Sequence, residues 1–142
     1  MKELSFYDHT LDELKESIQV QGLNRFQGEK VFKHFYKDLA LPGETSDDSH
    51  FSPKIWEFLE SSLAPFFPRS IDTQKSGDGT VKFRLQLKKG HTVETVLIPF
   101  RKKYTVCLSS QVGCGMGCEF CYTAKQGLTR QLSAGEIVAQ YV

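Results

Sequence analysis

All four cysteines of the chain lie in one short segment, and this constrains the fold more than any other feature of the sequence. Cys107, Cys114, Cys118 and Cys121 fall within fifteen residues, and the rest of the 142-residue chain has none. A disulfide scaffold would distribute its bridges along the chain to close loops. Thiols gathered in one segment instead indicate metal binding or thiol chemistry.

The central motif is a C-x3-C-x2-C spacing that runs from Cys114 through Cys118 to Cys121. Gly115 and Gly117 let the backbone turn tightly, so the three thiolates can converge on one small object. Four-iron clusters normally have four cysteine ligands, and three would leave one iron with an open position for a substrate or cofactor. The motif therefore predicts a catalytic iron–sulfur site.

Other uses of these thiols stay open at this point. Zinc could take Cys107 as a fourth ligand, although structural zinc sites usually combine two close ligand pairs separated by a longer loop. A thiol relay without metal and a set of buried cysteines are further alternatives. A non-catalytic zinc-binding or RNA-binding module is accordingly the competing hypothesis for the segment.

The first half of the chain has helical periodicity. A capping box at Thr10 and Glu13 predicts a helix start, and Gly22 predicts its end. Apolar side chains at helical spacing predict a second helix over residues 28–39, followed by a polar loop. Ser52 and Pro53 predict the start of a third helix. We expect residues 1–68 to form a small helical accessory domain.

The second half changes to a period of two, which is typical of strands. Alternating residues 81–88 and 92–98 predict a hairpin that ends at Pro99, within an antiparallel β segment over residues 69–99. A further strand over residues 104–108 leads into the cysteines, and a capping box at Ser133 and Glu136 begins a helix. Residues 100–142 thus resemble the first strand–loop–helix unit of a parallel barrel, cut short. The predicted fold class is α/β.

Charge is distributed unevenly between the two halves. Residues 1–68 hold 7 Lys/Arg and 12 Asp/Glu, a net of −5, whereas residues 69–142 hold 11 Lys/Arg and 5 Asp/Glu, a net of +6. Either the two halves attract each other, or the second half binds a polyanion. The basic side chains that could form a phosphate-binding face are Lys82, Arg84, Lys88, Lys89, Arg101, Lys102, Lys103, Lys125 and Arg130.

Several strings of the sequence resemble a known family. The three-cysteine motif is similar to the radical S-adenosylmethionine (SAM) signature, and the wider strings resemble the dual-specificity adenine C2-methyltransferases of large-subunit ribosomal RNA and transfer RNA. These strings span residues 28–36, 77–83, 93–99, 107–114 and 123–127. The resemblance covers essentially the whole chain and implies that it is the N-terminal part of a longer enzyme, inactive by itself.

The resemblance also implies roles for individual residues. Cys114, Cys118 and Cys121 would ligate a [4Fe–4S] cluster that binds SAM, and Glu94 would be the proton acceptor. Cys107 would resolve a protein–RNA crosslink through a transient disulfide, after a methyl group carried on a later cysteine has reached the adenine. The implied partners are rRNA, tRNA and an electron donor that reduces the cluster.

The remaining expectations concern the setting of the protein. The N-terminus carries acidic residues where a secretory signal would be apolar, and no apolar run approaches the roughly 18 residues of a membrane span. We expect a cytoplasmic monomer that does not enter a membrane.

Overall fold

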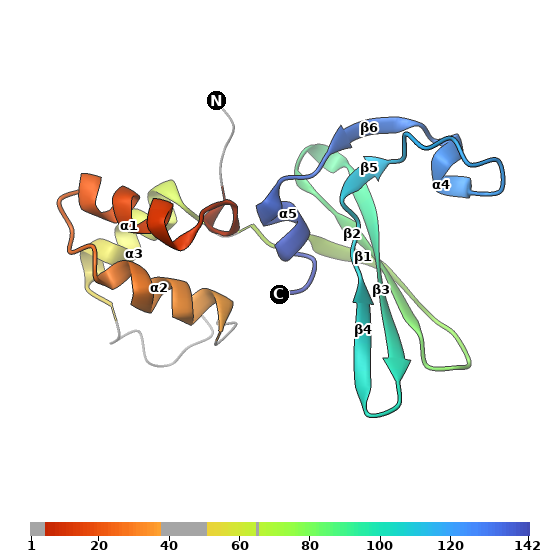
Figure 1. Cartoon of the computed structure of the whole chain (residues 1–142), viewed down its shortest axis with the longest axis horizontal. Coiled ribbons are helices and arrows are strands. Elements are labelled where there is room, and N and C mark those ends of the chain that lie inside the picture. Colours follow the sequence, from red (N-terminus) through yellow and green to blue (C-terminus); the bar gives the residue numbers. More distant parts are fainter. Residues whose placement is uncertain (1–4, 38–50, 65) are drawn as a thin grey trace. The chain divides into compact units, whose positions relative to one another are not determined.

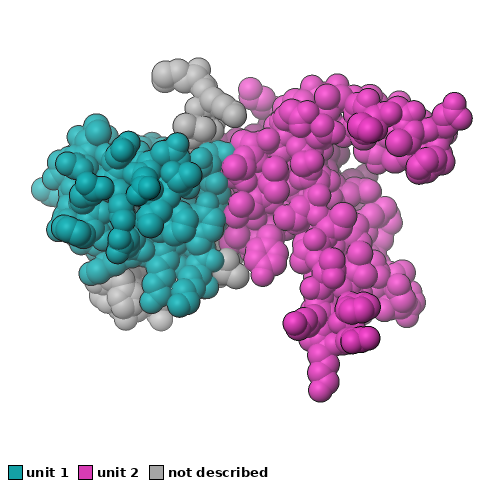
Figure 2. Space-filling view, in the orientation of Figure 1, with its two compact units in different colours: residues 1–65 teal, residues 66–142 magenta. Residues whose placement is uncertain are grey.

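The computed structural model describes residues 5–37, 51–64 and 66–142 of the chain. The chain divides into two compact units, residues 1–65 and residues 66–142, shown in different colours in Figure 2. Within the described ranges, every helix is too short or too polar to span a bilayer.

The first unit is helical, as the periodicity predicts. It contains the 3-10 turn η1 (Phe6–Asp8) and the helices α1 (Leu11–Val20), α2 (Gln27–Tyr36) and α3 (Pro53–Ser62) (Figure 1). The capping box of α1 is confirmed, because the Thr10 N–H donates to the Glu13 carboxylate over 2.7 Å and the Thr10 hydroxyl accepts from the Glu13 N–H. The predicted end of the second helix at Leu39, and the loop after it, lie outside the described residues.

Aromatic rings fill the core of this unit. The rings of Phe6 and Phe35 lie 4.6 Å apart, and those of Phe6 and Tyr7 meet edge to face at 5.4 Å. Leu14 and Ile18 from α1 pack with full burial in the same unit. The 3-10 turn is therefore packed against α2, and Phe6 and Tyr7 are among the most buried side chains of the described residues.

The second unit contains a four-stranded antiparallel sheet in the order β1-β2-β3-β4. Its strands are β1 (Arg69–Lys75), β2 (Val81–Gln86), β3 (Thr92–Phe100) and β4 (Lys103–Cys107) (Figure 1). The predicted hairpin is confirmed as β2 and β3, joined by the short turn η3 (Lys88–Gly90). Each described strand of this sheet runs antiparallel to its neighbours, β4 included.

The predicted end of the hairpin strand at Pro99 is wrong, because β3 continues through it to Phe100. The pairing with β2 ends at Leu97, whereas the pairing with β4 continues and places Pro99 opposite Tyr104. Beyond Leu97, β3 has a neighbour on one side only. A proline is tolerated there because its missing N–H can face the unpaired side.

After β4 the chain forms a small ribbon and a terminal helix. The ribbon pairs β5 (Gln111–Gly113) with β6 (Leu128–Gln131), and the helices are α4 (Tyr122–Lys125) and α5 (Ala134–Val138). The capping box of α5 is confirmed, since the Ser133 hydroxyl accepts from the Glu136 N–H over 3.2 Å. The core of this unit joins the sheet to the ribbon through Leu85, Leu87, Val93, Val112 and Leu132.

Candidate functional site

The motif cysteines lie on a loop that is closed at its base by two glycines. Gly113 ends β5 and Gly127 precedes β6, and both have a left-handed backbone, with φ of 75° and 68°. The Cys114 N–H donates to the Gly127 carbonyl over 3.1 Å. A Cβ at Gly113 would lie 1.9 Å from the same oxygen, so no other residue fits at this position without moving the backbone.

The thiols on this loop are free and partly accessible. Cys114, Cys118 and Cys121 are half-buried, and none of them is in a disulfide. The backbone turns between the last two, because the Cys121 N–H donates to the Cys118 carbonyl over 3.1 Å. Cys121 occupies the N-cap position of α4, where the backbone N–H of Ala124 and the N–H and hydroxyl of Thr123 hold the pKa of its thiol below the ordinary value.

The donor set of this loop suits a soft metal centre. Thiolates are the ligands that iron–sulfur clusters take, and three free thiols on one closed loop provide them. Among the described residues, no three His, Cys, Asp or Glu side chains are gathered closely enough to hold a metal ion. The structure thus brings the three cysteines onto one loop but does not draw their sulfur atoms together.

Three large side chains next to these cysteines in the sequence are exposed. Met116, Phe120 and Tyr122 expose 80%, 94% and 78% of their surface. The cysteine loop therefore carries several bulky side chains that no described part of the chain covers.

Glu94 and Cys107 share one face of the sheet, although they belong to different strands. Cys107 at the end of β4 is paired with Val96 of β3, and Glu94 lies two residues before Val96. Because residues two apart on a strand point to the same face, the two side chains are diagonal neighbours, typically about 7–8 Å apart. Both are exposed, so this face presents a carboxylate beside a thiol.

The same face carries two ion pairs. The Lys82 ammonium lies 3.2 Å from the Glu94 carboxylate, across the pairing of β2 with β3. The Arg84 guanidinium lies 3.9 Å from the Asp72 carboxylate of β1. Residues of the opposite face, such as Leu85 and Val93, are buried in the core of the unit.

The other basic residues named from the sequence are distributed over the turns and the ribbon. Lys88 and Lys89 form the β2–β3 turn, and the Lys88 ammonium lies 5.5 Å from the Phe66 ring. Arg101 and Lys102 form the β3–β4 turn before Lys103 of β4, and Lys125 ends α4. Arg130 makes a two-point ion pair with Glu136, with both N–O distances 2.7 Å.

Gln140 holds the backbone of Ser109 in place, a role that no signal in the sequence indicates. Its buried side-chain oxygen accepts from the Thr95 hydroxyl and from the Ser109 N–H, each over 2.9 Å. Its amide nitrogen donates to the Ser109 carbonyl over 2.8 Å. The Ser109 hydroxyl in turn donates to the backbone carbonyl of Glu94 over 2.7 Å. This network fixes the chain just after Cys107 against β3.

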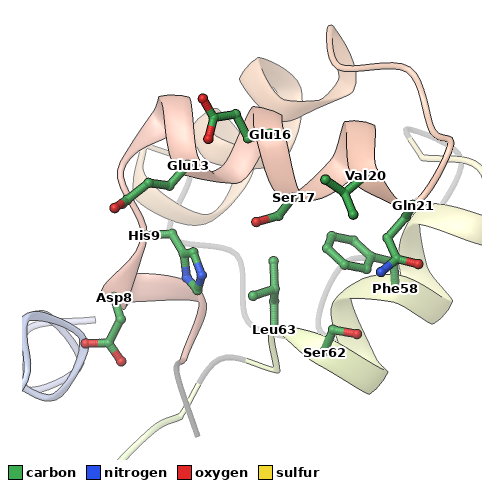
Figure 3. Close-up of a pocket in the computed structure, with 10 residues that line it drawn as sticks. All are labelled: Asp8, His9, Glu13, Glu16, Ser17, Val20, Gln21, Phe58, Ser62 and Leu63. Atoms are coloured by element: carbon green, nitrogen blue, oxygen red, sulfur yellow. The ribbon is translucent and has the colours of Figure 1, made fainter. Parts of the chain in front are cut away.

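A separate cavity of about 510 Å³ lies within the helical unit. Figure 3 shows His9 and the acidic residues Asp8, Glu13 and Glu16 among the residues that line it. Three carboxylates would repel a phosphate backbone. None of the residues selected from the sequence as site residues lines it, so this cavity is not part of the candidate site.

The chain is similar to known RNA methyltransferases. No family model matches it. It is 37% identical over 98% of its length to "Dual-specificity RNA methyltransferase RlmN" of Bdellovibrio bacteriovorus. It is 38% identical over 97% to the "Probable dual-specificity RNA methyltransferase RlmN" of Geobacillus kaustophilus, and 40% identical over 95% to that of Aquifex aeolicus. The chain spans 34%, 37% and 38% of the length of these three relatives.

A solved structure has the same fold. The crystal structure of a radical SAM methyltransferase from Sphaerobacter thermophilus superimposes with a TM-score of 0.81 and 34% sequence identity. The match covers 97% of this chain and 40% of that one. The mixed arrangement of helices and antiparallel sheets described above is therefore similar to part of a radical SAM methyltransferase.

Proposed function

Because the chain belongs to the RlmN family of dual-specificity RNA methyltransferases and matches their N-terminal portion, we propose that it is part of an enzyme that methylates C2 of an adenine in large-subunit rRNA and in tRNA. The observation that carries this proposal is the closed loop with three free thiols between Gly113 and Gly127. Such a loop offers three ligands from one short segment, as a cluster with one open iron requires.

In this proposal Cys114, Cys118 and Cys121 hold a [4Fe–4S] cluster, and the open iron binds SAM. When bound, the reduced cluster would supply the electron for the radical chemistry of SAM. The lowered pKa of Cys121 favours the thiolate, which is the form that binds iron. The exposed bulky side chains next to these cysteines in the sequence would help to exclude water from the reaction.

The exposed face of the sheet would supply the proton acceptor and the resolving thiol. Glu94 accepts a proton in this proposal, and Cys107 releases the RNA from its crosslink by forming a transient disulfide. Cys107 is a free thiol in this structure, as are the other three cysteines. The position of Glu94 and Cys107 on one face supports a shared reaction space.

The RNA would approach through the basic side chains of the second unit. Lys88, Lys89, Arg101, Lys102, Lys103 and Lys125 are exposed, as phosphate contacts require. Arg130 is held by Glu136 inside the unit, which leaves it less able to contact phosphate. The target adenine would have to leave its stack before its ring carbon could react.

We further propose that β4 is the first strand of a partial barrel, with residues 1–68 as its helical accessory domain and residues 69–99 as a linking β segment. In barrels of this type the active site lies at the carboxyl ends of the strands. Cys107 ends β4, and the cysteine loop follows it, which agrees with that rule. We expect the assembled enzyme to act as a cytoplasmic monomer with a separate electron donor.

Anaerobic reconstitution of the 142-residue chain with iron and sulfide tests this function. We expect a brown chromophore, and we expect Cys114→Ala, Cys118→Ala and Cys121→Ala each to lose most of the iron. Cys107→Ala is the matched control and should load as the unaltered chain does. Stoichiometric zinc with no iron uptake, or loading that survives the three substitutions, would contradict the proposal.

A further inference from the structure

Glu94 forms its ion pair with a cation that lies diagonal to it in the sheet, and not with the cation directly opposite. In the β2–β3 register Glu94 is directly opposite Arg84, whereas Lys82 is opposite Val96. The ion pair nevertheless joins Glu94 to Lys82, with 3.2 Å between ammonium and carboxylate. Glu94 is therefore paired diagonally, along the strand and not straight across it.

The reason lies on β1. Arg84 is directly opposite Asp72 on its other side, and its guanidinium pairs with the Asp72 carboxylate at 3.9 Å. Like charges repel and opposite charges attract over these distances, so Asp72 competes with Glu94 for Arg84. Lys82 is then the cation that remains for Glu94.

The diagonal pairing gives the carboxylate a direction. Lys82, Val96 and Cys107 form one row across β2, β3 and β4 on the same sheet face. By pairing with Lys82, the Glu94 carboxylate leans along its strand into the row that contains Cys107. It does so on the β2 side, because Lys82 and Cys107 lie on opposite sides of β3. A pairing with Arg84 would keep it in the neighbouring row.

We infer that Lys82 is a positioning residue for Glu94, holding its carboxylate in the row of Cys107 and not in the row of Arg84. This inference rests on the proposed function for the role of Glu94 and goes beyond it in the role of Lys82. It also changes what Lys82 is expected to do, because an ammonium engaged with Glu94 is not primarily a phosphate contact. The side chains are 38% and 52% exposed, so the pair directs the carboxylate more than it stabilises the fold.

Kinetics of the full-length gene product distinguish positioning from RNA binding. We expect Lys82→Met to lower kcat about tenfold while KM for RNA changes less than about twofold. Lys82→Arg should recover most of kcat, because it restores a cation at the same place. A higher KM at unchanged kcat would identify Lys82 as a phosphate contact and overturn the inference, as would unchanged kinetics.

A second measurement uses the 142-residue chain without any cofactor. With 13C-labelled glutamate, the carboxyl resonance of Glu94 can be assigned by its loss in Glu94→Gln. We expect this resonance to shift in Lys82→Met and to lie close to its original position in Lys82→Arg. Lys75→Met removes an exposed lysine of β1 and is the matched control, which should leave the resonance unmoved.

The two measurements separate the inference from the function on which it rests. A Glu94 resonance that does not respond to Lys82→Met would overturn the inference, even if the enzyme methylates RNA. Methyl transfer that is absent from the unaltered full-length enzyme would refute the proposed function, and the resonance would still test the pairing itself.

Discussion

The side-chain amide of Gln140 pairs with the backbone of Ser109 through two hydrogen bonds. The Ser109 N–H donates to the amide oxygen over 2.9 Å, and the amide nitrogen donates to the Ser109 carbonyl over 2.8 Å. An amide side chain can thus replace a neighbouring strand for one residue, at the point where β4 has ended. The Gln140 side chain thus holds the turn between the sheet and the cysteine loop, together with the bond from the Ser109 hydroxyl to the Glu94 carbonyl.

Replacement of this amide should be costly. In Gln140→Leu the Ser109 N–H and carbonyl and the Thr95 hydroxyl lose their buried partner, and each unsatisfied group costs about 1–3 kcal/mol. Because Ser109 is only half-buried, its two groups incur less than the full penalty. We expect urea unfolding of the sheet, followed by far-UV circular dichroism, to show a loss of about 2–4 kcal/mol. Gln86→Leu changes an exposed amide of β2 and should cost less than about 0.5 kcal/mol. Equal effects of the two substitutions would refute this account.

The base of the cysteine loop gives a second prediction. Gly113→Ala would place a Cβ 1.9 Å from the Gly127 carbonyl oxygen at a left-handed backbone, so we expect a loss of about 3 kcal/mol or more and a loop that no longer takes up iron. Gly77→Ala is the control, since a Cβ there meets nothing within 4 Å. Iron content after anaerobic reconstitution measures both variants. Full iron loading of Gly113→Ala would show that the closed base is dispensable.

A third prediction concerns pH and the helical unit. Burial, with a smaller contribution from Tyr36, raises the pKa of Tyr7 from 10.0 to about 12. Below about pH 10 Tyr7 is neutral in both states, whereas between pH 10 and 12 only the unfolded chain releases the proton, so stability falls as the pH rises. Fluorescence of Trp56, the only tryptophan, reports unfolding of this unit. We expect Tyr7→Phe to make the free energy of unfolding fall less steeply over this pH range. Replacement of the exposed Tyr141 by Phe should leave this pH dependence unchanged.

A fourth prediction concerns the two-point ion pair of Arg130 and Glu136. The side chains are 32% and 13% exposed, so removal of the guanidinium leaves a largely buried carboxylate without its cation. Arg130→Met should lower the free energy of unfolding by about 1–3 kcal/mol in urea titrations. Arg130→Lys should recover only part of this loss, because an ammonium cannot form the two parallel bonds. Complete recovery with lysine would mean that charge alone matters here.

The sequence predicted those elements that depend on neighbouring residues. Both capping boxes, at Thr10 and Ser133, and the alternation of β2 and β3 are local signals, and the structure confirms them. The strand β1 has no such signal, because six of its seven residues are exposed and no apolar face repeats along it. It forms because β2 offers it an edge.

The candidate site was predictable in its chemistry but not in its arrangement. The cysteine spacing identified the three thiols that share the loop, whereas the contact of Gly113 with Gly127 joins positions that no periodicity relates. Likewise, the choice of Lys82 over Arg84 as partner of Glu94 depends on Asp72 of another strand. Charge along the chain cannot show which of two cations a carboxylate takes, because a third residue decides it.

The contact between Gly113 and Gly127 has a consequence for the maturation of the protein. It fixes both ends of the cysteine loop at one point. The residues between them can therefore rearrange around a metal cluster while β5 and β6 keep their register. In the proposed function, uptake of the cluster would therefore be separate from formation of the sheet. A polypeptide of this kind can fold its sheet first and bind its metal cluster afterwards.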